Sequence, residues 1–423
     1  MTLASALIGI LAVAGVPLFL IISAIALLGF RSQGLDSVVY FAELMRLANN
    51  PTLVAVPLFT FAGYMLAESH APERMVRLAR ALFGWMPAGL AVVALAVMAL
   101  FTAFTGASGV TIVAMGGLLL PVLMKANYSE RFSLGLLTSS GSIGLLFPPS
   151  LPLILYGVVS QTSIDKLFMG GIVPGLLLVA GMAGFAIQSR RGVHRPAPET
   201  KERLLPALKG AIWEAPLPII IVGGIYGGFF TAAEASVVTV SYLLIVECFI
   251  LRDLHFFKDL PRVIQESSVL VGGILVILGA ALALTNFLIY ADIPTAILGW
   301  IQEFVSSKVT FLLLLNVFLL IVGCLMDIFS ALVVVVPLIL PIAVHYGVDP
   351  LHLGIIFLAN LEIGYCTPPV GLNLFIASFR FRKPILELYQ ATLPFLAIQL
   401  IVLILITYVP QLTLFPIKLF SSR

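Results

Sequence analysis

Two long apolar segments of this chain are each interrupted by a pair of adjacent prolines, and these interruptions constrain the fold more than any other feature. Pro148-Pro149 and Pro368-Pro369 both lie within apolar stretches of membrane-crossing length. A proline pair removes two backbone donors and pushes the preceding residue away from helical geometry. Irregular backbone at membrane depth survives only where it is buried in protein or lines a cavity. The breaks therefore predict a polar site inside a membrane, built from backbone and hydroxyl groups.

The second break repeats the first at a fixed distance along the chain. A separation of 220 residues relates five pairs: Pro121 and Pro341, Gly144 and Gly364, Pro148 and Pro368, Pro149 and Pro369, and Pro174 and Pro394. We interpret this as an internal duplication of about half the chain. In membrane proteins, duplicated halves with interrupted segments in corresponding positions point to a transport site between them.

The composition identifies the class of protein. The chain has 423 residues, of which 61% are hydrophobic and only 10% are charged, whereas soluble proteins carry about 25% charged residues. The predicted fold class is therefore an all-α polytopic membrane protein, with inverted repeats, two re-entrant hairpins and two broken helices. The sequence contains no Gly-x-x-x-x-Gly-Lys-Ser/Thr loop for a nucleotide. Energy for transport must then come from an ion gradient.

The repeat sets the predicted domain boundaries. The first inverted repeat is placed at 1–210, with a hairpin at 88–124 and a broken helix at 132–160, and a connecting span follows at 211–232. The second inverted repeat is placed at 233–423, with a hairpin at 309–344 and a broken helix at 351–379. The transport domain is predicted to comprise 88–160 plus 309–379, with the remainder as a scaffold.

Basic loops predict the orientation. Cytoplasmic loops are enriched in Lys and Arg, which assigns 68–84, 125–131, 189–210, 252–262 and 380–387 to the cytoplasm. This assignment requires that both hairpins turn back without crossing. Five crossings then precede the second repeat, so the repeats are inverted, the N-terminus is cytoplasmic and the C-terminus periplasmic.

Two hairpin tips carry candidate ion ligands. Asp327 lies between long apolar runs, and a carboxylate there is expected to coordinate sodium or couple protons. The alternative is an aspartate in a surface loop. At the other tip, Thr105–Gly109 offers carbonyls and the Ser108 hydroxyl to a cation. The alternative there is a small-residue contact between helices.

Further candidate oxygen ligands flank the breaks, and the alternative for each of them is a hydroxyl that packs between helices. Ser139, Ser140, Ser142 and Asn360 precede them, and Ser150, Thr367 and Asn373 lie at or just after them. Glu362 is interpreted as a structural or helix-end residue. The sequence Gly106-Ala-Ser-Gly109 also matches a motif of rhomboid-type intramembrane serine proteases. That remote alternative needs a histidine buried near Ser108.

With these motifs in hand, the chain resembles the large membrane subunit of tripartite ATP-independent periplasmic (TRAP) transporters, within the ion transporter superfamily of elevator carriers. The resemblance is carried by Phe104-Thr-Gly-Ala-Ser-Gly-Val110, Gly141-Ser-Ile-Gly-Leu-Leu-Phe-Pro-Pro-Ser150, Gly228-Phe-Phe-Thr-Ala-Ala-Glu-Ala235 and Thr367-Pro-Pro-Val-Gly-Leu-Asn373. It implies a carrier and not an enzyme: a sodium-driven importer of small organic acid anions in the bacterial inner membrane.

The resemblance also implies a set of ligands. Two or more sodium ions would be held by Gly106, Ser108, Gly109, Ser140, Gly144, Asp327, Ser330, Gly364 and Thr367. Substrate would contact Ser108, Ser150, Asn360, Thr367 and Asn373. Sialic acids, dicarboxylates, sugar acids and sulfonates all fit such a site.

Two partners follow from the same resemblance. A periplasmic binding protein would deliver the substrate. A small four-helix membrane subunit would pack against the chain, and we expect it to be a separate chain. The competing interpretation is a channel or a cation/proton antiporter.

Overall fold

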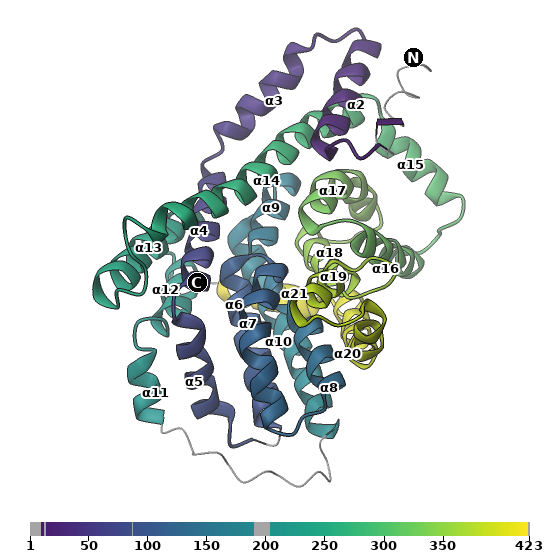
Figure 1. Ribbon diagram of the computed structural model, residues 1–423. Coiled ribbons are helices and arrows are strands. Elements are labelled where there is room, and N and C mark those ends of the chain that lie inside the picture. The colour runs from purple at the N-terminus through teal and green to yellow at the C-terminus, as the bar shows by residue number, and fades with distance from the viewer. Residues whose placement is uncertain (1–9, 12–13, 87, 190–203, 422–423) are drawn as a thin grey trace.

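The fold is an assembly of helices. The computed structural model describes residues 10–11, 14–86, 88–189 and 204–421, and no strand occurs among them (Figure 1). Eight helices of this described part are long and apolar enough to cross a membrane. The apolar stretch at residues 3–30, which is long enough to cross a membrane, is covered only in part, since residues 1–9 and 12–13 lie outside the described residues. Most of the predicted basic loop at 189–210 lies outside them too.

The first half contains a helical hairpin and a broken helix in the predicted order. Its elements are α2 (Leu18–Ser32), α3 (Val38–Ala48), η1 (Pro51–Val54), α4 (Ala55–Glu68), α5 (Ala71–Phe83), α6 (Gly89–Thr105), α7 (Ser108–Lys125), α8 (Glu130–Ser140), η2 (Ile143–Leu146), α9 (Leu151–Ser160) and α10 (Ile164–Ser189). The helices α6 and α7 form the first hairpin. The segments on either side of the first proline pair are bent by 45°.

The second half follows the same plan after a connection. The connection consists of α11 (Leu204–Gly210) and α12 (Pro216–Tyr226), and the second half of α13 (Ala232–Leu243), the π-helix η3 (Leu244–Ile250), α14 (Asp259–Tyr290), α15 (Ile293–Gln302), α16 (Lys308–Leu325), α17 (Ile328–His345), α18 (Pro350–Gly364), α19 (Leu372–Phe381), α20 (Ile385–Tyr408) and α21 (Gln411–Ser421). The helices α16 and α17 form the second hairpin, and α18 and α19 flank the second proline pair.

Local sequence signals explain where several of these helices begin. A capping box of the Thr-x-x-Glu type opens α13, because the Thr231 amide donates to the Glu234 carboxylate at 2.8 Å and the Thr231 hydroxyl caps the start of the helix. Gly106 ends α6 with a φ of +64°, a left-handed conformation that glycine adopts without strain. This residue allows the chain to turn sharply from α6 into α7.

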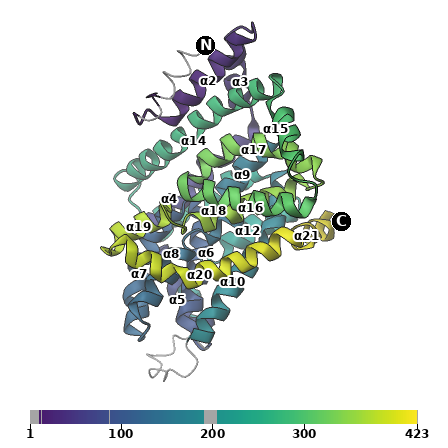
Figure 2. The ribbon, with the colours of Figure 1, turned by 90° about the vertical axis from the view of Figure 1, so that its right-hand side faces the viewer.

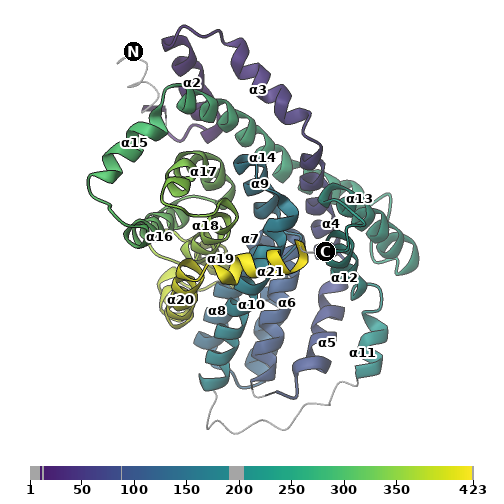
Figure 3. The same ribbon diagram turned by 180° about the vertical axis from the view of Figure 1, so that it is seen from behind.

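The helices form two groups. The long helix α14 packs against α2, α3 and α4, and these helices form one side of the molecule in all three ribbon views (Figures 1, 2 and 3). The hairpins, the broken helices, α10 and α20 form the other group, in which α20 packs along α8 and α10. The buried apolar core runs through both groups.

Candidate functional site

The two broken helices meet at equivalent positions of the repeat. The Ser142 hydroxyl donates to the backbone carbonyl of Glu362 at 3.2 Å, and these residues are separated by 220 positions. An approximate two-fold axis generates such a contact when it passes between the two copies of one position. The contact therefore lies at the centre of the duplicated architecture.

Buried polar atoms surround the contact between Ser142 and Glu362, and two of them have no hydrogen-bond partner. The Asn373 amide nitrogen lies 3.4 Å from the Ser142 hydroxyl and 3.7 Å from the Cys366 sulfur. The Cys366 thiol donates in turn to the carbonyl of Thr138 at 3.5 Å. The amide oxygen of Asn373 and the hydroxyl of Thr138 are buried without a hydrogen-bond partner. Buried polar atoms in native proteins are normally paired, so orphaned oxygens indicate a place for a polar ligand.

Glu362 is the most unusual group at this centre. Its side chain is fully buried, and its carboxylate has no side-chain hydrogen-bond partner and interacts with the backbone of Leu146 in η2. The residue lies two positions before the end of α18, as expected of a helix-end residue. The helix-end interpretation does not explain why a carboxylate lies there with no counter-charge.

The tip of the first hairpin is wedged between the second halves of both broken helices. A Cβ atom built on Gly106 would lie 2.7 Å from Cβ of Leu151 in α9. A Cβ on Gly109 would lie 2.7 Å from Cδ1 of Ile376 in α19. Ser108 begins α7 and is buried. The small residues of this motif thus permit close packing, and the same packing brings the tip to both breaks.

A threonine cluster that the sequence interpretation missed lies beneath this tip. The Thr102 hydroxyl lies 2.9 Å from the Thr111 hydroxyl and 2.9 Å from the carbonyl of Gly141 in the first break. The hydroxyls of Thr105 and Thr111 are 3.2 Å apart. Four oxygens are therefore concentrated in one buried place. The signal available in the sequence was the spacing of Thr102 and Thr105, which puts both on one face of α6.

At the second tip, Asp327 caps a helix. Its Oδ2 atom accepts from the backbone amides of Phe329 and Ser330, both at 3.1 Å. The amide of Ile328 donates to the Tyr365 hydroxyl at the second break. Asp327 is partly buried and its Oδ1 atom is left available. The structure thus shows a capping role for Asp327 and leaves its ion-binding role as a prediction.

Glycines of the two breaks press against the hairpin of their own half. A Cβ on Gly144 would lie 2.2 Å from the carbonyl oxygen of Ala99 in α6. A Cβ on Gly364 would lie 2.6 Å from the carbonyl carbon of Gly323 in α16. Gly144 and Gly364 are related by the 220-residue repeat. Each half of the chain therefore contains the same close approach between a break and a hairpin helix.

Other predicted ligands are bonded elsewhere. The hydroxyls of Ser140 and Thr367 donate to carbonyls within their own segment, of Leu137 and Ile363 respectively. Ser150 caps α9, and its hydroxyl donates to the carbonyl of Leu145. The printed contacts do not join these three residues to the central Ser142–Glu362 contact.

Asn360 belongs to a separate buried network that the sequence interpretation also missed. Its amide nitrogen donates to Asn316 at 2.7 Å, and Asn316 donates to Thr407 at 3.1 Å. This network joins α18, α16 and α20. The Asn360 amide oxygen has no hydrogen-bond partner.

The protease alternative finds no support in the site. Among the described histidines, His70, His255, His345 and His352, none is hydrogen-bonded to Ser108. His345 contacts Gln302, and His352 contacts Thr413. None of the histidines that the structure describes is therefore bonded to the serine as the general base of such a protease would be.

A duplicated membrane fold with two helical hairpins and two broken helices around a buried polar centre defines a secondary carrier. Residues 3–412 match the family described as "Tripartite ATP-independent periplasmic transporter, DctM component". The chain belongs to this family. It is a multi-pass inner-membrane transporter component and not an enzyme.

Several relatives are TRAP transporter permease proteins, and one solved structure has a similar fold. The chain is 35% identical over 410 residues to the isethionate TRAP transporter permease protein DctMQ of Oleidesulfovibrio alaskensis, covering 95% of this chain and 64% of that protein. It is 35% identical over 375 residues to the C4-dicarboxylate TRAP transporter large permease protein DctM of Pseudomonas aeruginosa, covering 88% and 87%. It is 30% identical over 406 residues to the ectoine TRAP transporter large permease protein TeaC of Halomonas elongata, covering 95% of each. The fold is similar to that of the Alcanivorax borkumensis YdaH transporter, with a TM-score of 0.61, 15% identity, and coverage of 87% and 86%.

Proposed function

We propose that this chain is the membrane-spanning carrier of a sodium-driven importer for a small organic acid anion. The observation that carries the proposal is the meeting of the two breaks at Ser142 and Glu362. Orphaned oxygens surround that meeting point, and a hairpin tip is wedged between the two breaks. A carrier needs such a site at the interface of its repeats, with a gate on each side.

The donor set of the first half fits an alkali cation. Sodium is a hard cation and prefers oxygen ligands. The threonine cluster beneath the first tip supplies the hydroxyls of Thr102, Thr105 and Thr111 together with the carbonyl of Gly141. The glycines at 106 and 144 allow the backbone to approach this region closely. We propose that these groups, with Ser108, hold one sodium ion.

The second half offers a different donor set. Asp327 supplies a formal negative charge at the tip, and Ser330 is buried one turn away. The break next to it contributes Gly364 and Thr367. We propose that these groups hold a second sodium ion. The sodium charge would offset the Asp327 carboxylate within the membrane, where an unpaired carboxylate is costly.

The substrate would lie between the second halves of the broken helices. The N-termini of α9 and α19 follow the two breaks, and helix N-termini favour anions. Among the predicted substrate ligands, Ser150 caps α9, Asn373 lies in the first turn of α19, and Ser108 begins α7 at the tip that packs against both helices. The names of the relatives cover a sulfonate, C4-dicarboxylates and ectoines, so these compounds are the first substrates to test.

We propose that transport occurs by an elevator motion. The moving block would include the hairpins, the broken helices and also α10 and α20, because these two helices pack on α8 and on each other. The helices α2 to α5 and α11 to α15 would form the scaffold. The family implies a small membrane subunit and a periplasmic binding protein as partners.

The test is uptake by the assembled system in proteoliposomes. The chain, its small subunit and its binding protein would be reconstituted, and uptake of labelled isethionate, succinate and ectoine measured with and without an inward sodium gradient. We expect uptake of one compound that requires both sodium and the binding protein. Uptake driven equally by a proton gradient alone, or ion flux without any solute, would favour the antiporter or channel and overturn the proposal.

A further inference from the structure

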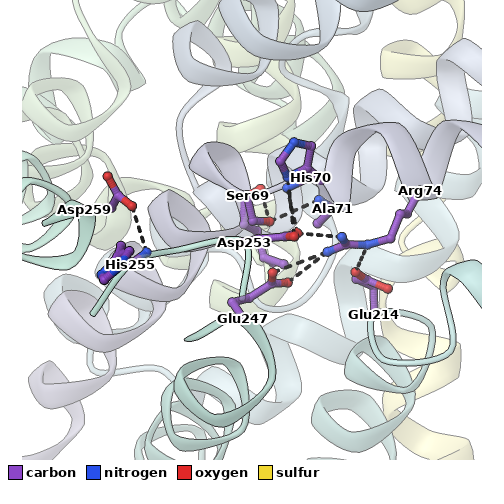
Figure 4. Close-up of polar contacts among 10 residues, drawn as sticks. Ser69, His70, Ala71, Arg74, Glu214, Glu247, Asp253, His255 and Asp259 are labelled. Atoms are coloured by element: carbon purple, nitrogen blue, oxygen red, sulfur yellow. Dashed lines mark hydrogen bonds and ion pairs between the residues drawn. The ribbon is translucent and has the colours of Figure 1, made fainter. Parts of the chain in front are cut away.

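A buried ionic junction lies apart from the breaks, on the side of the molecule where α5 meets the connections around α12 and η3. Arg74 of α5 contacts three carboxylates that come from three different segments (Figure 4). Glu214 precedes α12, Glu247 lies in η3, and Asp253 follows η3. These segments are distant in the sequence from Arg74, so the junction ties separate parts of the chain together.

The junction uses the whole guanidinium group. The Nε atom of Arg74 donates to Glu214, one terminal nitrogen donates to Asp253, and the other lies 3.3 Å from Glu247. The exposed fraction of the Arg74 side chain is 9%, and that of Glu247 is 0%. Removing one partner from such a buried ion pair is strongly destabilising, because the other charges lose their compensation.

The charges in the junction do not balance. One guanidinium faces three carboxylates, and the Oε2 atom of Glu214 is buried without a hydrogen-bond partner. His70 lies 3.4 Å from Asp253, but its side chain is largely exposed. A fully ionised junction would therefore hold two excess negative charges away from water, which is costly.

The carboxylates outside the membrane spans differ in how readily they take up a proton. Burial raises the pKa of Glu214, and Arg74 only partly opposes this shift. Burial also acts on Asp253, but the hydrogen bonds from Arg74 and from the His70 amide outweigh it and lower the pKa of that carboxyl. The charged and titratable groups that face Glu214 are His70, Arg74, Tyr242, Glu247 and Asp253. Glu214 is therefore a better proton acceptor than Asp253.

The helix that Arg74 holds leads directly into the first hairpin. The helix α5 packs against α6 along its length. The corner between them is tight, since a Cβ on Gly89 would lie 2.5 Å from the carbonyl oxygen of Phe83. A displacement of α5 would consequently move the start of α6. In this arrangement the position of α5 thus sets the position of the start of α6.

Among the described residues of the second half, no corresponding junction occurs. The helix α15 occupies the place before the second hairpin, and Pro294 lies 220 residues after Arg74. No residue of α15 is charged. The junction is therefore not required by the repeat and belongs to the first half alone.

We propose that Arg74 is a positioning residue for the first hairpin, and that it anchors α5 to α12 and η3 within the scaffold through a junction that takes up a proton to balance its charge. Its consequence for transport rests on the function proposed above. At low pH a proton on one of the two buried carboxylates, Glu214 or Glu247, removes one excess negative charge, and Arg74 holds α5 in place. As the pH rises this proton is lost, and the attachment of α5 weakens.

The first test measures the anchor without any substrate. A reporter cysteine, Ala79→Cys, is placed on the buried face of α5, and its labelling by a maleimide is quantified by mass spectrometry of the peptide. We expect Arg74→Met to speed labelling about tenfold or more. The matched control is Arg77→Met, an exposed arginine on the same helix, which should leave the rate unchanged.

A variant in which all four junction residues are neutral distinguishes the loss of the anchor from a general loss of stability. The variant Arg74→Met/Glu214→Gln/Glu247→Gln/Asp253→Asn has no buried charge to destabilise it, so we expect its melting temperature to recover. Its labelling should nevertheless stay fast, because nothing holds α5. Labelling at the wild-type rate in this variant would show that the Arg74 junction does not hold α5 in place.

The proton is tested by the pH dependence of the same labelling. The ratio of the rate at Ala79→Cys to the rate at an exposed cysteine on α15, Ala296→Cys, removes the intrinsic pH dependence of the thiol. We expect this ratio to rise with pH, and to become independent of pH in Glu214→Gln/Glu247→Gln, which keeps both acceptors for Arg74. If this ratio does not change with pH when the junction is wild type, the proposed dependence of the junction on a proton is wrong.

Uptake in proteoliposomes then tests the consequence for transport. We expect turnover of Arg74→Met to fall while the KM for solute stays near wild type, because the anchor does not contact the substrate. Wild-type turnover in Arg74→Met would overturn the positioning role. Absence of sodium-dependent uptake in the wild-type system would instead refute the proposed function. The labelling results would still show whether Arg74 holds α5 in place.

Discussion

At the scale of single residues, Asp327 combines a capping role that is visible with an ion-binding role that is proposed. Asparagine is as good a helix N-cap as aspartate, so Asp327→Asn should keep the bonds to Phe329 and Ser330 and lose only the charge. We expect a melting temperature close to that of the wild-type protein and a loss of sodium-dependent uptake. Uptake at several sodium concentrations measures this.

The chain supplies a matched control for that substitution. Asp349 caps α18 in the same way and is exposed, with its carboxylate accepting from Leu351 at 2.8 Å. Asp349→Asn should leave both stability and uptake unchanged. Wild-type sodium dependence in Asp327→Asn would restrict Asp327 to its capping role.

Thr102 offers a second test at this scale, because valine has the shape of threonine without the hydroxyl. In Thr102→Val the carbonyl of Gly141 and the hydroxyl of Thr111 each lose a neighbour at 2.9 Å. Leaving a buried polar group unsatisfied costs about 1–3 kcal/mol. We expect a lower melting temperature, and a higher sodium concentration for half-maximal uptake, because one oxygen ligand is lost.

Thr60→Val is the control for the loss of a buried hydroxyl. The Thr60 hydroxyl is buried in α4 and donates only to the carbonyl of Val56 in its own helix, at 2.7 Å. Its removal should leave the sodium requirement unchanged. An equal sodium requirement in both variants would identify the threonine cluster as helix packing alone.

At the scale of elements, each break depends on its close approach to a hairpin arm. In Gly144→Ala the new Cβ would lie 2.2 Å from the carbonyl of Ala99, so α6 and the first break must separate. Overpacking of this kind costs about 1–3 kcal/mol. Thermal unfolding of the purified protein should therefore show a clear loss of stability in this variant.

The comparison for Gly144→Ala is Gly184→Ala in α10. Gly184 is exposed, and no atom lies within 4 Å of a Cβ built there. That substitution should be neutral or stabilise the helix by about 0.5–1 kcal/mol. If both variants unfold at the same temperature, the break does not require the close approach.

The breaks, the hairpin tips and the capping box at Thr231 were predictable, because proline, glycine and capping residues act on the backbone within a few positions. The Arg74 junction was not predictable, because its partners lie 140 to 179 residues away and only the packing of α5 brings them together. The burial of Glu362 was missed for the same reason. Its environment is set by the other half of the chain, through η2 and the contact with Ser142.

At the scale of the whole molecule, the two groups of helices touch where α4 passes the first tip. A Cβ on Gly63 would lie 2.4 Å from the carbonyl oxygen of Phe104 and 2.5 Å from Cα of Thr105. The scaffold and the moving block of the proposed elevator are thus packed backbone to backbone in this arrangement. A larger residue at position 63 disfavours this arrangement and leaves others untouched.

Gly63→Ala should therefore shift the population of the carrier toward an arrangement in which the tip has left α4. A cost of about 1–3 kcal/mol changes the ratio of two states by roughly 5- to 150-fold. A cysteine at the tip, Ala107→Cys, reports the change through its labelling by a membrane-impermeant maleimide added to either side of sealed vesicles. We expect Gly63→Ala to reverse the side from which labelling is faster. Gly273→Ala in the scaffold helix α14, where no atom lies within 4 Å of the new Cβ, should leave the labelling as it is in wild type. If Gly63→Ala destabilises the protein while the tip stays accessible from the same side, the contact between α4 and the tip is static and the elevator motion is wrong.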